Sequence, residues 1–239
     1  MTGASHTIAL SALRRAAPRI GAPDRRPIVE HRQDGAASDR LPACPPRLDG
    51  AEFVGRIELM PLPFRTTARL SLRPVTEDDL SLMVDLNSDP AVMAHILGRP
   101  ASPAETAAEW SERLWQRTDA GRGLGYWAGY HAEQFVGWWG ASAFVDHIDM
   151  SSIGYRLHRA AWGRDLATEG ARVMVAQALS APGVTRVVAS TMDVNCASRR
   201  VLQKVGLVLV GTHVQEWDDP IPGWEQGEAE YELMRPDAS

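Results

Sequence analysis

The sequence predicts one α/β domain over residues 63–239, in which helices flank a mixed β-sheet. The first observation is the order of periodic segments from Phe64 onward: strand, two helices, three strands, helix, strand, helix and two strands. The second is composition, because 239 residues with 44% hydrophobic and 23% charged side chains can bury one sizeable core. The third is the different character of residues 1–62, which excludes them from this pattern.

Residues 1–62 are predicted to form a disordered tail rich in proline and arginine. They show no sustained period of 3.6 or 2, and such a composition buries too little apolar surface to offset the entropy of ordering. Three alternatives stay open at this point: a start codon assigned too early, a segment that binds a partner, or an organelle transit peptide, since the first 23 residues lack acids.

The first elements of the domain have clear local signals. Residues Arg69–Arg73 alternate as a strand and stop at Pro74. Thr76–Asp79 has the pattern of a capping box, which predicts a helix start, and the apolar stripe that follows ends at Asn87–Pro90. A second start, with cap, proline and acid in order, lies at Ser102–Glu105 and predicts a helix to about residue 118.

The remaining elements alternate between the two periods. Strands are predicted at 125–130 and 135–144 with a hairpin turn between them, and then at Ser151–His158, Arg186–Met192, 207–210 and 231–234. Helices are predicted from about Ala167 to the Ala181–Gly183 stop, and over Ala197–Lys204 with Gly206 as the residue after its C-terminus.

The stretch Trp162–Ala171, WGRDLATEGA, joins a predicted strand to a predicted helix. The first N–H groups of a helix have no partner within it and lie at the positive end of its dipole, so such a turn suits an anion. Gly163 allows close approach to the backbone, and Arg159 and Arg164 add positive charge. Asp165 is unexpected there, because a carboxylate at an N-cap can accept the same N–H groups that a phosphate would use.

A second polar segment, Asn195–Gly206, follows the predicted strand Arg186–Met192. Asn195 is placed to cap a short helix, and its amide is also a group that can bind the amides of a ligand. Ser198 lies one turn further on the same face. Taken alone, the segment is equally an ordinary capped helix with a solvated basic face.

Three stretches together carry a resemblance to a known family: Leu70–Pro74 with Asp79 and Asn87–Pro90, then Ile153–Glu169, and then Asn195–Gly206. In order and spacing they resemble the GNAT superfamily of acyl-CoA-dependent N-acyltransferases, and in particular its branch of ribosomal-protein N-terminal (alanine) acetyltransferases. The resemblance covers about 170 residues, which is all of the chain except the tail.

The resemblance implies a largely antiparallel, twisted sheet whose central strands splay apart near His158 and Asp193, with acetyl-CoA as co-substrate in the splay. It implies that an acetyl group passes directly to a primary amine, either a protein N-terminus or a small molecule. Asn195 would contact the pantetheine arm, and Ser198 would be the catalytic proton donor to the leaving thiolate. The residues implied to bind acetyl-CoA are Leu157, Arg159, Trp162, Gly163, Arg164, Asp165, Leu166, Ala167, Thr168, Asn195, Ser198 and Lys204.

Two positions depart from the family pattern. The family usually has glycine where this chain has Asp165, and it often has a glutamate base where this chain has Ser152. The general base is therefore unassigned, and the acidic or imidazole candidates are Glu225, Glu228, Glu230, Asp146, His147 and Asp149. The same departures support an alternative, a degenerate module that binds acyl-CoA weakly or not at all and acts in regulation or interaction.

Composition narrows the other classes. The net charge of −5 gives no reason to expect nucleic acid, and no apolar run approaches the roughly 20 residues that span a bilayer. Cys44 and Cys196 lie in no ligand motif and are interpreted as reduced thiols, and the seven histidines show no metal-binding spacing. We therefore expect a cytoplasmic protein without a metal, and the family resemblance adds a possible homodimer.

Overall fold

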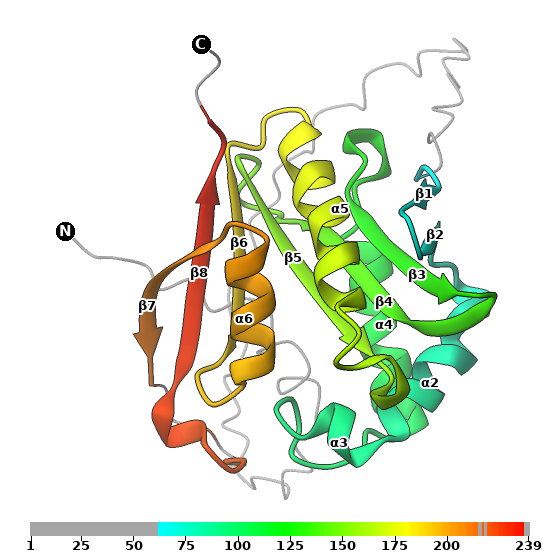
Figure 1. Cartoon of the computed structure of the whole chain (residues 1–239), viewed down its shortest axis with the longest axis vertical. Coiled ribbons are helices and arrows are strands. Elements are labelled where there is room, and N and C mark those ends of the chain that lie inside the picture. The colour runs from blue at the N-terminus through cyan, green and yellow to red at the C-terminus, as the bar shows by residue number, and fades with distance from the viewer. Residues whose placement is uncertain (1–61, 215–216, 218, 237–239) are drawn as a thin grey trace, which may run out of the picture. The chain divides into compact units, whose positions relative to one another are not determined.

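The computed structural model describes residues 62–214, 217 and 219–236 (Figure 1). The predicted tail, apart from Leu62, lies outside the described residues, and so does Cys44. The described strands are β1 Arg65–Thr66, β2 Ser71–Pro74, β3 Gly125–His131, β4 Gln134–Ala143, β5 Met150–Leu157, β6 Arg186–Met192, β7 Val208–His213 and β8 Glu228–Met234. The described helices are α2 Leu80–Ser88, α3 Pro90–Met93, α4 Pro103–Gln116, α5 Leu166–Ser180 and α6 Cys196–Lys204.

The strands form one 8-stranded sheet in the order β1-β2-β3-β4-β5-β6-β8-β7. Within the described residues β5 and β6 are parallel and the other neighbouring pairs are antiparallel. The predicted mixed, largely antiparallel sheet with flanking helices is therefore confirmed. Among the described strands and α-helices, β1 and α3 were not predicted, and Asp89 alone separates α3 from the end of α2.

The residues that end α2 also begin the short helix α3. The sequence predicts that Asn87–Pro90 ends a helix, and α2 does end at Ser88. Asp89 then accepts a hydrogen bond from the N–H of Ala91 at 2.8 Å, and Pro90 takes the first helical position of α3. The same residues therefore close one helix and cap the next.

The cap, proline and acid predicted at the start of α4 are in place, and they form a capping box. Glu105 N donates to Ser102 Oγ at 3.2 Å, and Ser102 N donates to Glu105 Oε2 at 2.8 Å, with Pro103 at the first helical position. At the earlier start, Thr76 N donates to Asp79 Oδ2 at 2.9 Å, although Glu77–Asp79 is a short 3₁₀ turn that leads into α2.

Two layers of helices cover the sheet, with α5 and α6 on one face and α2 and α4 on the other (Figure 1). Adjacent tryptophans on β4 show the alternation, because Trp139 packs in the cluster with α5 and α6 and Trp138 packs in the cluster with α2 and α4. Both side chains are almost fully buried. The central strands β4 and β5 are thus held between two cores.

Among the described residues, no helix combines the length and the apolar character needed to cross a membrane. The His, Cys, Asp and Glu side chains of these described residues nowhere gather in a group of three that could hold a metal ion.

Candidate active site

The predicted splay lies between β5 and β6. The two strands pair only from Met150 opposite Arg186 to Ser152 opposite Val188, although β5 continues to Leu157 and β6 to Met192. Figure 1 shows them running together where they begin and spreading apart toward their C-terminal ends. Each strand keeps its other partner along its length, β4 for β5 and β8 for β6. Beyond Ser152 and Val188, the edges of β5 and β6 that face each other therefore do not pair with each other.

Leu157 presents its backbone toward the splay. His158 N donates to Val136 O on β4 at 3.0 Å, and alternate residues of an antiparallel strand face the partner strand. The N–H and C=O of Leu157 consequently point away from β4, toward the side of β6. The indole N–H of Trp162 donates to Leu157 O at 2.9 Å, so Trp162, which is half exposed, already occupies that carbonyl.

The turn between β5 and α5 contains two residues in the left-handed conformation. Gly163 has φ 68° and Asp165 has φ 62°. A Cβ added at Gly163 would meet nothing within 4 Å, so the turn is open to an approaching molecule. Glycine adopts this conformation freely, whereas for Asp165 it is less favourable, which is consistent with a family pattern that has glycine there.

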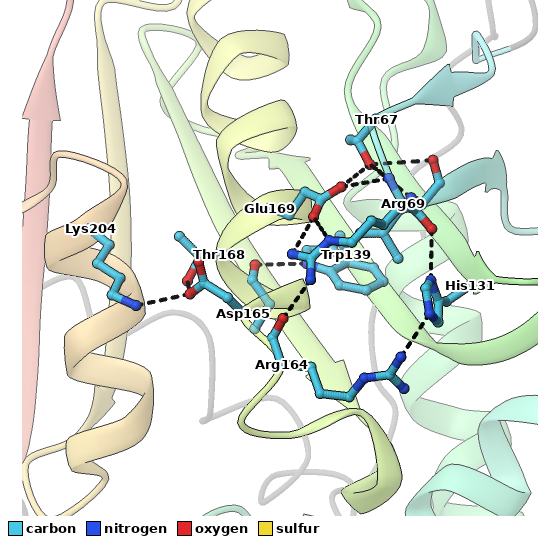
Figure 2. Close-up of polar contacts among 11 residues, drawn as sticks. Thr67, Arg69, His131, Trp139, Arg164, Asp165, Thr168, Glu169 and Lys204 are labelled. Carbon is cyan, nitrogen blue, oxygen red and sulfur yellow. Dashed lines mark hydrogen bonds and ion pairs between the residues drawn. The ribbon is translucent and has the colours of Figure 1, made fainter.

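Asp165 occupies the N-cap position of α5 but does not cap the helix with its side chain. Its Oδ1 accepts hydrogen bonds from Thr168 Oγ1 at 2.7 Å and from Lys204 Nζ at 2.9 Å (Figure 2). The hydrogen bond from Lys204 and then that from Thr168 lower the pKa of Asp165 below its usual value, so the carboxylate is charged at neutral pH. The self-capping that the sequence allowed does not occur.

The first N–H groups of α5 are consequently free. Glu169 N donates to Asp165 O at 3.1 Å, but among the described residues no acceptor lies on the N–H of Leu166, Ala167 or Thr168. Free N–H groups at the positive end of a 15-residue helix are chemically suited to an anion. The side chains of Leu166 and Thr168 are buried, so these residues offer an anion their backbone rather than their side chains.

A polar network joins the first turn of α5 to the segment between β1 and β2 (Figure 2). Glu169 accepts hydrogen bonds from Thr67 and from the guanidinium and backbone N–H of Arg69. Arg69 Nη1 also donates to Arg164 O at 2.8 Å, and Trp139 Nε1 donates to Ala167 O at 3.1 Å. No sequence signal gave Thr67 or Arg69 a role, because their partner Glu169 lies about 100 residues away.

The two arginines of the turn differ in their surroundings. Arg164 Nη2 lies 2.8 Å from His131 Nε2 on the β3–β4 hairpin, which holds this side chain back toward the sheet. Arg159 is exposed, in the short 3₁₀ turn Arg159–Ala161 that follows β5. Of the two, Arg159 has the greater freedom to reach a bound anion.

Asn195 caps α6, because its Oδ1 accepts the N–H of Ser198 at 3.1 Å. Ser198 Oγ lies 3.0 Å from the hydroxyl of Tyr155, which is also 3.2 Å from Ser198 O. Burial raises the pKa of Tyr155 above its ordinary value, so its hydroxyl keeps its proton. No sequence signal gave Tyr155 a role, and the structure makes it the hydrogen-bond partner of Ser198.

The opposite face of β5 carries a buried charge cluster that sequence reasoning missed. Arg156 donates to Glu109 on α4 at 3.0 and 3.2 Å and to Asn87 at the end of α2. Arg113, on α4, donates to the same carboxylate at 2.8 Å. Burial opposes ionisation of Glu109, but Arg156 and Arg113 outweigh it and lower its pKa to about 2. The cluster fixes β5 to both helices of this layer; the only sequence signal was the i, i+4 spacing of Glu109 and Arg113.

The candidate bases divide by their position along the strands. Asp146, His147 and Asp149 precede β5, and so lie at the end of the strand opposite the splay. Ser152 is buried, and its carbonyl accepts the hydroxyl of Ser142 at 3.2 Å. Glu228 begins β8 opposite Met192, the last residue of β6, and is only 3% exposed. Glu230 Oε2 lies 3.3 Å from His213 Nε2.

Comparison with known proteins agrees with this geometry. The family model described as "Acetyltransferase (GNAT) domain" matches residues 69–208. The FsC-acetyl coenzyme A-N(2)-transacetylase of Aspergillus fumigatus is 34% identical over 177 residues, which is 71% of this chain and 75% of that protein.

Solved structures with the same fold include two acetyltransferases in complex with CoA. RimL, a ribosomal L7/L12 alpha-N-protein acetyltransferase, matches with a TM-score of 0.59 and 18% identity over 73% of this chain and 97% of its own. The spermidine N-acetyltransferase of Vibrio cholerae matches with a TM-score of 0.58 and 14% identity, over 70% of this chain and 96% of its own.

Proposed function

Because the chain belongs to the acetyltransferase (GNAT) family and uses acetyl-CoA as co-substrate, we propose that it transfers the acetyl group to a primary amine. One observation carries the proposal: the free N–H groups at the start of α5 lie beside the splayed strands β5 and β6. An anion seat next to an exposed strand edge fits a ligand that combines a diphosphate with an amide-bearing arm.

The residues of the turn and of α6 divide the work of binding. The N–H groups of Leu166, Ala167 and Thr168 hold the diphosphate, and the positive φ of Gly163 keeps the backbone open to it. The N–H of Leu157 pairs with the pantetheine arm. Asn195 has its oxygen committed to the α6 cap, so the group that it offers the arm is its NH₂.

Acetyl-CoA supplies a thioester that a neutral amine attacks directly, with the thiolate as leaving group. Ser198 Oγ gives its proton to that thiolate and regains one from water once the thiol has left, while the hydroxyl of Tyr155, 3.0 Å away, stays protonated and hydrogen-bonded to it. Glu228 is our candidate for accepting the proton of the amine, because it is the buried carboxylate at the open end of the splay. No covalent intermediate on the enzyme is required.

Two acceptor classes have support. The relative from Aspergillus fumigatus is named for transfer to N(2), and the spermidine enzyme acts on a small amine, which favours a small-molecule acceptor. The likeness to RimL favours a protein N-terminus and is the support for the ribosomal-protein branch. The relative from Aspergillus fumigatus is 34% identical to this chain and RimL is 18% identical, so a small-molecule amine is our first choice.

The alternative function, a degenerate module that binds acyl-CoA weakly or not at all, loses its main support. It rested on Asp165 occupying the helix N–H groups and on Ser152 replacing a base. The carboxylate of Asp165 is turned to Thr168 and Lys204 instead, and the N–H groups have no acceptor among the described residues.

Release of free thiol from acetyl-CoA tests the proposal, with a panel of small amines and a panel of N-terminal peptides as acceptors. We expect turnover with members of one panel, and Ser198→Ala should lower kcat about 100-fold while the dissociation constant of acetyl-CoA stays within about twofold. Ser180→Ala, at the far end of α5, is the matched control and should behave as the wild type. Tight acetyl-CoA binding without thiol release from any acceptor would contradict the proposed transfer, and an unchanged kcat in Ser198→Ala would remove Ser198 from it.

A further inference from the structure

An ion pair joins the elements that follow the two diverging strands. Lys204 Nζ, in the last turn of α6, lies 2.9 Å from Asp165 Oδ1, at the start of α5 (Figure 2). Helix α5 follows β5 and α6 follows β6, so the pair connects the two sides of the splay. The side chains of Lys204 and Asp165 are 56% and 49% exposed, and both can therefore move without disturbing the core.

The pair stands beside the anion seat that the proposed function assigns to the diphosphate. Asp165 is adjacent in sequence to Leu166, the first residue whose N–H is free. A negative charge at this place repels a diphosphate, and the ammonium of Lys204 attracts it. Lys204 therefore has two competing partners, one fixed in the protein and one that arrives with the co-substrate.

The two side chains differ in how firmly they are held. Asp165 Oδ1 also accepts the hydroxyl of Thr168 at 2.7 Å, and Thr168 is buried, so the carboxylate keeps a partner when the ammonium leaves. The described residues give Lys204 no other hydrogen bond or ion pair, and its four-carbon stem is flexible. The lysine is thus the member that moves.

We propose that Asp165 and Lys204 form a latch between α5 and α6 that opens when acetyl-CoA binds, with Lys204 exchanging the carboxylate for a phosphate. The inference rests on the proposed function, because it needs the diphosphate at the start of α5. The latch explains why this chain can have Asp165 where the family pattern has glycine. In the free protein the carboxylate binds the ammonium group of Lys204, and acetyl-CoA binding is weakened by the free energy needed to break this ion pair.

A broken ion pair leaves a signature in a double-mutant cycle. Asp165→Asn removes the charge but keeps an oxygen for Thr168 and a residue type that tolerates positive φ. Lys204→Met keeps the length of the side chain without its charge. If Lys204 leaves Asp165 when acetyl-CoA binds, the effect of Asp165→Asn on the dissociation constant depends on Lys204. Asp165→Asn then tightens acetyl-CoA binding about two- to fivefold more in the protein with Lys204 than in the Lys204→Met variant, because the free energy of an exposed ion pair corresponds to that factor.

Calorimetric dissociation constants of acetyl-CoA for the wild type, both single variants and the double variant measure this coupling. Urea unfolding of the same four proteins without acetyl-CoA should give a coupling of similar size and opposite sign. Both should shrink at about 1 M salt, where exposed charges are screened. The Arg99 and Glu105 pair, 2.6 Å apart and similarly exposed, is the matched control: its cycle should couple in unfolding and not in binding.

The sequence offers a second readout, because Lys204 is its only lysine. Labelling with an amine-reactive reagent, read by mass spectrometry, should be faster at Lys204 in Asp165→Asn than in the wild type, and acetyl-CoA should protect Lys204 in the variant. Additive binding effects, or no protection in Asp165→Asn, overturn the latch while leaving acetyl-CoA binding intact. Failure of all four proteins to bind acetyl-CoA overturns the proposed function and the latch with it.

Discussion

Replacing Glu109 by glutamine is the sharpest test of how the site is supported. The carboxylate is 3% exposed and contacts Arg156 at 3.0 Å and Arg113 at 2.8 Å, whose side chains are 6% and 16% exposed. Glutamine has nearly the same volume, so no cavity forms, but two guanidinium groups lose the only negative charge of their cluster. Removing one partner of a buried ion pair costs about 3–5 kcal/mol, against a total stability of about 5–15 kcal/mol for a domain.

Urea unfolding measures the effect as a lower midpoint with an unchanged slope. Glu112→Gln is the control on the same helix, since its ion pair with Arg117 spans 3.4 Å and is more exposed, and it should cost less than about 1 kcal/mol. The difference between wild type and Glu109→Gln also depends on pH. The pKa of Glu109 is about 2 in the folded protein, against an ordinary value of 4.5, so its stabilisation is complete above about pH 4.5 and disappears as the pH falls toward 2.

A cost of Glu109→Gln below about 1 kcal/mol, or a difference from wild type that does not narrow between pH 4.5 and 2, would refute this reasoning. The result bears on the site because Arg156 neighbours Tyr155 and Leu157 on β5. The cluster and the site therefore share one strand, and a shift of β5 would displace both the Leu157 N–H and the Tyr155 hydroxyl.

Two further predictions concern the turn and the helix beside it. Gly170→Ala should destabilise the protein by about 1–3 kcal/mol in thermal or urea unfolding, because the added Cβ would lie 2.4 Å from the ring of Trp139, whereas Gly163→Ala has open space and should cost only the roughly 1–2 kcal/mol of its positive φ. Asp165→Gly should tighten acetyl-CoA binding at least about fivefold in calorimetry, since it removes an exposed negative charge worth about 1 kcal/mol beside the diphosphate and also frees Lys204; equal dissociation constants would contradict that repulsion.

Local signals in the sequence determined most of the elements. The capping box at Ser102–Glu105, the Gly206 stop and the strand Arg186–Met192 all appear where the sequence predicts them, because each depends on residues within one turn or one strand. The order of these elements, with the family resemblance, also led to the mixed sheet and to the splay between β5 and β6.

The site was only partly predictable, because some of its contacts join residues that are far apart in the sequence. The sequence placed Asp165 at the N-cap of α5 and Ser198 on the face of Asn195, and both positions are confirmed. It could not tell that the carboxylate turns to Lys204, 39 residues away, or that Ser198 meets Tyr155 from another strand.

Backbone conformation and helix caps follow from neighbours in the chain, so the sequence by itself determined where most of the strands and helices lie, and with them the turn that leads into α5. The direction of a polar side chain is decided by competition among partners that folding brings together, such as Thr168 and Lys204 around Asp165. Only the tertiary structure decided that competition, and with it the freedom of the α5 N–H groups to bind an anion.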